Sequence, residues 1–224
     1  MGTSLKWLLF GILGVILLGC DRQIHTPLKG DPGVPIREIV GSKYCKPAGE
    51  GEYASLEGVV DSKGFDGSHY YAEGGGCIER PLLDTWAVTH NGDALKWSEA
   101  SIKSPMVRTP TEEVLFLFTT HYEAGSLIKP NWKINWYHTI ANGTFEAPER
   151  ILIVYKKEWG TSFISHWEGN ITLERLDENV TAFSMYNSIS GTRIDEKNAV
   201  GGVHDLLDNF RRHKPNWEYL QEQK

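Results

Sequence analysis

The sequence predicts an α+β fold, in which antiparallel strands fill the middle of the chain and a long amphipathic helix ends it. In residues 132–140, apolar side chains at even positions alternate with more polar ones, which is the period of a strand buried on one face. Residues 151–155 form a continuous apolar run that is typical of a central strand. Near the C-terminus, apolar residues recur at the spacing of one helical stripe: Val203, Leu206, Leu207 and Phe210. Strands followed by a terminal helix define the α+β class.

The elements that precede this region are shorter. Residues 53–76 are rich in glycine and predict short strands and turns. Pro81 stands at the first position of an apolar pattern and predicts a short helix over residues 81–90, followed by a turn at 93–98.

The strand region is divided by turn residues. Turns are expected at Asn142–Gly143, Trp159–Gly160 and residues 177–179. The strands predicted around them are 114–120, 132–140, 151–155, 160–167, 170–176 and 181–189.

The terminal helix has clear limits. Asp195 and Glu196 suit its positive N-terminal end, and Pro215 blocks its continuation. Gly201 and Gly202 near its start would weaken an isolated helix, so we expect them either to pack closely on a sheet or to leave room for a cavity.

The composition excludes some classes of protein. Of 224 residues, 23 are Lys or Arg and 29 are Asp or Glu, so the net charge of −6 and the lack of a long basic run argue against nucleic-acid binding. Eight tryptophans indicate an ordered core rather than a disordered chain. No histidine pair has metal-site spacing and no nucleophile or phosphate-loop motif is present, so we predict no metal and no cofactor.

The N-terminus is the most specific signal. Lys6 precedes an uncharged apolar run of residues 7–19, which is shorter than the roughly 20 residues that span a bilayer. The run ends in Leu17-Leu18-Gly19-Cys20 and resembles the lipobox of bacterial lipoproteins. The alternative is a plain signal anchor with an incidental cysteine.

The lipobox resemblance implies a signal peptide over residues 1–19 and a lipidated Cys20 that anchors the protein in a membrane of the bacterial envelope, facing the periplasm or the exterior. Asp21 directly after the cysteine favours the inner membrane over the outer. Residues 20–44 carry three prolines and three glycines and predict a flexible tether to a single domain over residues 45–224.

If Cys20 is lipidated, Cys45 and Cys77 remain as an even pair in an oxidising compartment. We expect a structural disulfide between them. Two free thiols, or a metal or redox pair, are the alternatives.

The order of elements, together with several segments, resembles the START-like (SRPBCC, helix-grip) superfamily over about residues 70–213. Residues 78–86 are similar to its first strand and the opening of its first helix. Further similar positions are Trp97, 166–173, 179–183 and the terminal helix. Residues 100–113, with two prolines, depart from the usual second helix. The resemblance implies a curved antiparallel sheet that grips the terminal helix, with an apolar cavity between them.

Six residues are candidates for lining such a cavity: Trp136, His138, Phe163, Trp167, Phe183 and Met185. For each of them taken singly, a plain core position is the favoured alternative. An aromatic interior with a few polar atoms is also what a small-molecule pocket contains.

Three functions follow as hypotheses. The first is a non-catalytic lipoprotein that binds a hydrophobic small molecule or lipid in the cavity. The second is a cyclase or hydrolase in the same cavity, which would require His138 and Glu168 to point inward. The third is a structural or assembly protein with a filled core.

Overall fold

The computed structural model describes residues 23–25, 34, 37, 43–49, 52–55, 60–97, 100–109, 114–125 and 129–218. Its strands are β1 (Gln23–His25), β2 (Cys45–Gly49), β3 (Glu52–Ser55), β4 (Val60–Phe65), β5 (Tyr70–Ile78), β6 (Ala100–Thr109), β7 (Phe116–Ala124), β8 (Asn131–Gly143), β9 (Pro148–Thr161), β10 (Ile164–Asp177) and β11 (Val180–Gly191). Its helices are α1 (Leu82–Val88), the 3-10 helix η2 (Gly92–Leu95) and α2 (Glu196–Arg212).

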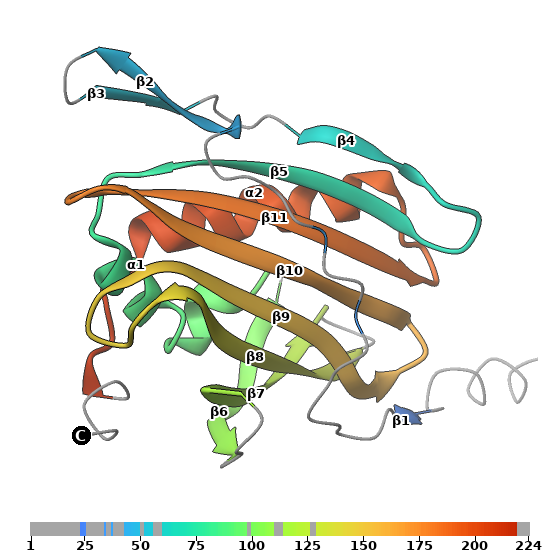
Figure 1. Cartoon of the computed structure of the whole chain (residues 1–224). Helices are drawn as coiled ribbons and strands as arrows, with labels where there is room; N and C mark the ends of the chain where they lie inside the picture. Colours follow the sequence, from blue (N-terminus) through green and yellow to red (C-terminus); the bar gives the residue numbers. More distant parts are fainter. Residues whose placement is uncertain are drawn as a thin grey trace, which may run out of the picture.

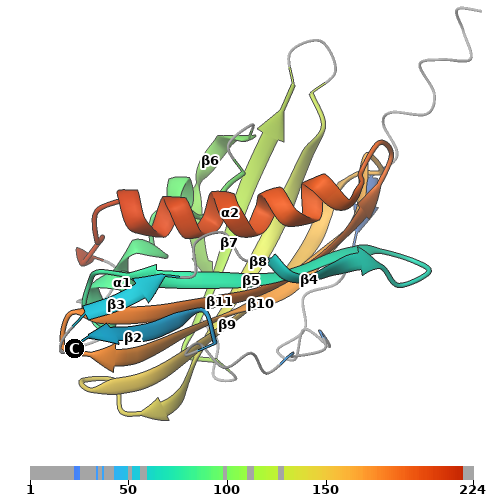
Figure 2. The ribbon, with the colours of Figure 1, turned by 90° about the horizontal axis from the view of Figure 1, so that it is seen from above.

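The main sheet has the strand order β4-β5-β11-β10-β9-β8-β7-β6, and every neighbouring pair is antiparallel. β1 pairs with the end of β9, and β2 with β3 forms a separate hairpin. The sheet is curved, and α2 crosses its concave face (Figures 1 and 2). This is the helix-grip arrangement, so the predicted α+β fold is confirmed.

Between residues 160 and 176 the prediction of two strands is wrong. β9 continues to Thr161, the chain turns at residues 162 and 163, and β10 then runs unbroken from Ile164 to Asp177. Gly160, predicted as a turn residue, lies in β9 with φ 144°, where an added Cβ would stand 2.6 Å from the Cβ of Trp132. Gly160 is therefore a packing position that accommodates Trp132, and not a turn residue.

Residues 100–109, part of the segment that departs from the START-like pattern, form strand β6 on the edge of the sheet beside β7. Pairing breaks around Ser104 and between Ser104 and Val107, where Pro105 lies. A proline is tolerated there because an edge strand can leave one amide side unpaired.

Helix α2 follows its predicted limits. The Asp195 side chain accepts hydrogen bonds from the backbone of Lys197 and Asn198, and the Asn198 side chain accepts one from the backbone of Asp195 in return, forming a capping box. The predicted apolar stripe is buried: Val203, Leu206, Leu207 and Phe210 are at most 3% exposed.

The two glycines of α2 have different surroundings. A Cβ on Gly202 would lie 2.6 Å from Asn187 Nδ2 and 3.0 Å from Trp97 Nε1, whereas a Cβ on Gly201 would meet nothing within 4 Å. Gly202 therefore allows the helix to pack closely on the sheet. The alternative expectation, that these glycines leave room for a cavity, is wrong at Gly202 because the space is occupied.

The opposite, convex face of the sheet carries part of the segment predicted as a tether. Val34 is buried against Leu117, Tyr137 and Val154. The Arg37 guanidinium lies 4.4 Å from the ring centroid of Tyr186, and its backbone exchanges two hydrogen bonds with the side chain of Asn170. At these positions the chain lies on the sheet.

The predicted disulfide between Cys45 and Cys77 is present and joins β2 to β5. It ties the N-terminal hairpin to the domain. The signal peptide and Cys20 lie outside the described residues, so the lipid anchor stays a prediction.

We predict opposite effects of alanine at the two glycines of α2. Gly202→Ala should lower the free energy of unfolding by about 1–3 kcal/mol, because Asn187 is held by other bonds and cannot retreat. Gly201→Ala should raise it by about 0.5–1 kcal/mol through helix propensity alone. Chemical denaturation of the two variants measures both effects, and equal losses would contradict the close packing at Gly202.

Candidate functional site

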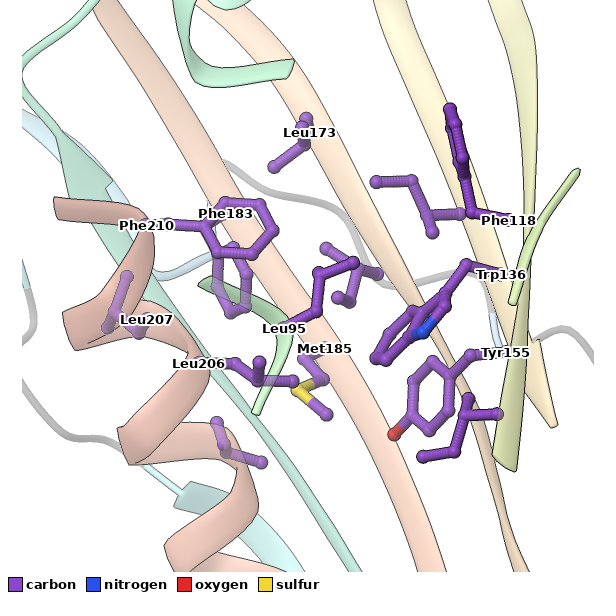
Figure 3. Close-up of a cluster of buried hydrophobic side chains, with 14 of the residues drawn as sticks. Leu95, Phe118, Trp136, Tyr155, Leu173, Phe183, Met185, Leu206, Leu207 and Phe210 are labelled. Atoms are coloured by element: carbon purple, nitrogen blue, oxygen red, sulfur yellow. The ribbon is translucent and has the colours of Figure 1, made fainter. Parts of the chain in front are cut away.

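The predicted cavity residues come together on the concave face of the sheet. Five of them, Trp136, His138, Trp167, Phe183 and Met185, are at most 2% exposed, and Phe163 packs half-buried at the margin of the same core. Figure 3 shows Phe183 and Met185 close to Leu206 and Phe210 of α2, with Trp136 and Tyr155 further along the same face. The Phe183 and Phe210 rings meet edge to face at 5.2 Å between centroids. Helix and sheet are thus in direct apolar contact.

Many interior polar atoms are paired within this core. Asn187 Oδ1 accepts hydrogen bonds of 2.8 Å from both the Tyr155 hydroxyl and Trp167 Nε1. Its Nδ2 donates to the carbonyl of Ala199 in α2 at 2.8 Å. Trp136 Nε1 donates to Thr120 Oγ1 at 2.8 Å. Asn187 therefore joins two strands to the helix, and these five side chains serve the fold.

A second group of interior rings lies under α1, and we call it the histidine cluster. It comprises Trp86, His90, Phe116, Phe118, His138 and Phe145. Its members come from α1, β7, β8 and two loops, and its two imidazole centroids are 5.6 Å apart. Arg108 lies over the Phe116 ring at 4.9 Å, so a cation borders the cluster.

His138 has a defined protonation state. Burial holds its pKa well below 6.5, so the imidazole is neutral near pH 7. Trp86 Nε1 donates to His138 Nδ1 at 3.1 Å, which requires Nδ1 to be the unprotonated nitrogen. The proton is therefore on Nε2, which is buried and finds no acceptor within the described part of the chain. His138 thus presents an interior N–H donor surrounded by aromatic rings.

The margin of the histidine cluster is apolar and only partly buried. Phe145 of the cluster is itself half-buried, and the half-buried core residues on or next to the elements that supply the cluster are Leu83 of α1, Leu115 before β7 and Ile140 of β8. An apolar molecule could contact this margin and the rings behind it.

Two further buried donors, the indole N–H groups of Trp97 and Trp132, lie toward the end where β8 begins. Trp97 and Trp167 stack with centroids 4.1 Å apart, and Trp132 lies 6.2 Å from each. The Nε1 atoms of Trp97 and Trp132 are buried and have no acceptor among the described residues. Lys157, opposite Ile134 in the β8–β9 register, is only 4% exposed.

The sequence analysis missed Lys157 because it ended the strand at residue 155. Ile153, Tyr155 and Lys157 alternate, and β9 runs to Thr161, so this period places Lys157 on the buried face. This alternation was the sequence signal that could have predicted the burial of Lys157. Trp132 was recognised only as a strand residue. Whether its indole Nε1 finds an acceptor depends on which side chains surround it in the folded protein.

Glu168 does not join the interior groups. It lies on the convex face, where its carboxylate is 3.8 Å from both Lys156 Nζ and His166 Nε2. The cyclase or hydrolase hypothesis required His138 and Glu168 in one cavity, and the structure places them on opposite faces of the sheet.

No helix in the described part of the chain has the length and apolarity needed to cross a membrane. Within the same residues, no group of three or more His, Cys, Asp or Glu side chains is arranged to hold a metal ion.

No family model matches the chain, and no curated protein sequence is significantly similar to it. Among solved structures, a protein of Thermus thermophilus is 13% identical with a TM-score of 0.45, covering 63% of this chain and 94% of its own. The Zhui aromatase/cyclase of Streptomyces sp. R1128 is 12% identical with a TM-score of 0.39, covering 69% and 86%. The lipid transfer and protein localization domain of human StarD13 is 8% identical with a TM-score of 0.41, covering 68% and 89%. Similarity this low says nothing about a shared ligand or reaction.

We predict that Lys157 makes stability depend on pH. Burial lowers the pKa of Lys157 to about 8, below the value of about 10.4 expected in an unfolded chain. The unfolded state therefore binds more protons between these values, and the free energy of unfolding should rise as pH rises from 8 to 10.5. Lys157→Met should be more stable than wild type at pH 7, and the difference should shrink over that interval. Parallel curves for the two proteins in denaturant titrations would contradict the burial of a charged amine.

Proposed function

We propose that the protein is an envelope lipoprotein whose helix-grip domain binds a hydrophobic small molecule or lipid without catalysis. The ligand would lie on the concave side of the sheet, against the histidine cluster and its apolar margin. The lipid on Cys20 would hold the domain at the membrane.

The observation that carries this proposal is the Nε2–H of His138, which has no partner among the residues that the structure describes. A buried donor without an acceptor costs about 1–3 kcal/mol of stability, and well-packed interiors rarely retain one. An apolar molecule with one acceptor oxygen would satisfy the donor and contact the surrounding aromatic rings. The tautomer fixed by Trp86 favours an acceptor over a donor at this point.

The membrane address is supported by the sequence around Cys20. Several acyl chains on one residue bind a bilayer far more firmly than one chain does, at about 0.8 kcal/mol per buried CH₂. Asp21 favours the inner membrane over the outer. A domain held in this way would present its ligand beside the bilayer.

The ligand is tested on the full chain produced in a Gram-negative host and purified in detergent. Mass spectrometry of the extracted material should find one apolar species in stoichiometric amount, absent from a control lipoprotein purified identically. His138→Phe should bind it about tenfold more weakly, because the donor is lost. His138→Gln should retain more, since an amide can accept from Trp86 and still donate.

His121→Phe is the matched control, because His121 lies outside the concave face against Trp159 and Asn131. It should leave the ligand content unchanged. If the wild-type protein carries no stoichiometric species and His138→Phe unfolds no differently from His121→Phe, the filled-core, structural function replaces the binding function.

The anchor is tested by labelling cells with radioactive palmitate. The wild-type chain should incorporate label and fractionate with membranes, and Cys20→Ala should lose the label. If Cys20→Ala incorporates as much label as the wild-type chain, the lipid is not on Cys20.

A further inference from the structure

Strand β1 shows at which end of the domain the N-terminal part of the chain meets the sheet. It pairs antiparallel with the last residues of β9, with Gln23 opposite Thr161 and His25 opposite Trp159. Followed from His25 to Gln23, β1 therefore runs in the direction in which β9 leads past Thr161 into its turn. The N-terminal side of β1 points out of the domain at the β9–β10 turn (Figure 1, right).

Several turns share this end of the sheet, which we call the β9–β10 end. Directly after β11, the backbone N–H of Thr192 donates to the carbonyl of Phe163 in the β9–β10 turn. The β4–β5 turn, residues 66–69, is held to β10 by the stacked rings of His69 and His166, whose centroids are 3.8 Å apart. The β8–β9 and β10–β11 turns lie at the opposite end of the strands.

The residue predicted to carry lipid is only three positions from β1. An extended chain spans at most about 3.6 Å per residue, so Cys20 lies within about 11 Å of Gln23 in any conformation. The 14 residues of β10 span about 45 Å from this end to the other. A lipid on Cys20 would therefore hold the β9–β10 end at the bilayer and keep the opposite end away from it. The apolar run of residues 7–19 would do the same as a signal anchor.

An exposed aromatic ring marks the same end. Phe65 is the last residue of β4, directly before the β4–β5 turn, and it is 57% exposed. Its ring packs against Tyr70 across the hairpin, with 5.0 Å between centroids. Among the described residues, the other exposed large apolar side chains are Val107 in the middle of β6 and Trp217 beyond α2. An exposed ring is favourable where it can enter the headgroup layer of a bilayer.

We propose that the β9–β10 end of the domain rests on the phospholipid headgroups, with the Phe65 ring in the interfacial layer and the histidine cluster toward the end that is turned away from the bilayer. Phe145 of that cluster lies in the β8–β9 turn, at the opposite end. A ligand bound there would stay within one domain length of the bilayer, on the side that faces the compartment. This inference rests on the proposed membrane anchor and adds the surface of the domain that contacts lipid.

Energy transfer from the two ends of β11 tests this orientation. Thr192→Cys and Glu178→Cys each place one dye on an exposed turn, because Cys45 and Cys77 are bonded to each other. The full chain is placed in nanodiscs of phosphatidylethanolamine and phosphatidylglycerol, with an acceptor dye on the lipid headgroups. Transfer from the Thr192→Cys dye should be about twofold or more stronger than from the Glu178→Cys dye, because the 12 residues of β11 separate the two by roughly 40 Å.

Two exposed apolar positions test the contact made by Phe65. Phe65→Cys and Val107→Cys are matched, because the native side chains are 57% and 59% exposed. A fluorescent dye on each is measured in nanodiscs whose lipids carry a nitroxide quencher on the headgroup. The dye of Phe65→Cys should be quenched several-fold more strongly, because Val107 lies opposite Thr119 in the body of the sheet.

Equal transfer from the two ends of β11, stronger transfer from Glu178→Cys, or equal quenching at Phe65→Cys and Val107→Cys would overturn the orientation. The anchor fails separately. A wild-type chain that takes up no palmitate and leaves the nanodiscs removes the anchor and the orientation together. A palmitate-labelled chain with equal transfer from both ends loses only the orientation.

Discussion

The docking of α2 across the concave face is the constraint on which the rest of the interior depends. The Asn187 side chain accepts hydrogen bonds from Tyr155 of β9 and Trp167 of β10, and it donates one to the Ala199 carbonyl of the helix. Gly202 presents no side chain at the same place, so the helix axis can come close to the sheet. Because a buried amide held by three hydrogen bonds has essentially one position, this contact fixes the height and the rotation of α2.

Once α2 is fixed, its stripe of Val203, Leu206, Leu207 and Phe210 is buried where the helix packs on β5 and β11. The space nearer the two ends is then lined by rings rather than by the helix. His138 lies toward α1, while Lys157 and Trp132 lie at the end where β8 begins. The N–H groups of His138 and Trp132, which have no acceptor among the described residues, lie on β8 away from this stripe.

The convex face has a different role. Arg37 is held by Tyr186, Glu73 and the Asn170 side chain, and Cys45 is bonded to Cys77. These contacts connect the N-terminal segment to β5, β10 and β11, and two of these strands, β5 and β11, also pack against α2.

The sequence by itself determined the elements whose signals are local. Period-two alternation, the capping residues around Asp195 and the stripe of α2 each depend on near neighbours in the chain, and the structure has them at the expected residues. The resemblance to helix-grip proteins supplied their arrangement, and the cysteine count supplied the bridge. Only the tertiary structure decided that Gly160 is a packing position, that β10 is unbroken, that Glu168 faces away from His138, and that Lys157 is a buried residue. Each of these features depends on which residues face a given residue from another strand or helix. The order of residues along the chain does not give the distances between such residues.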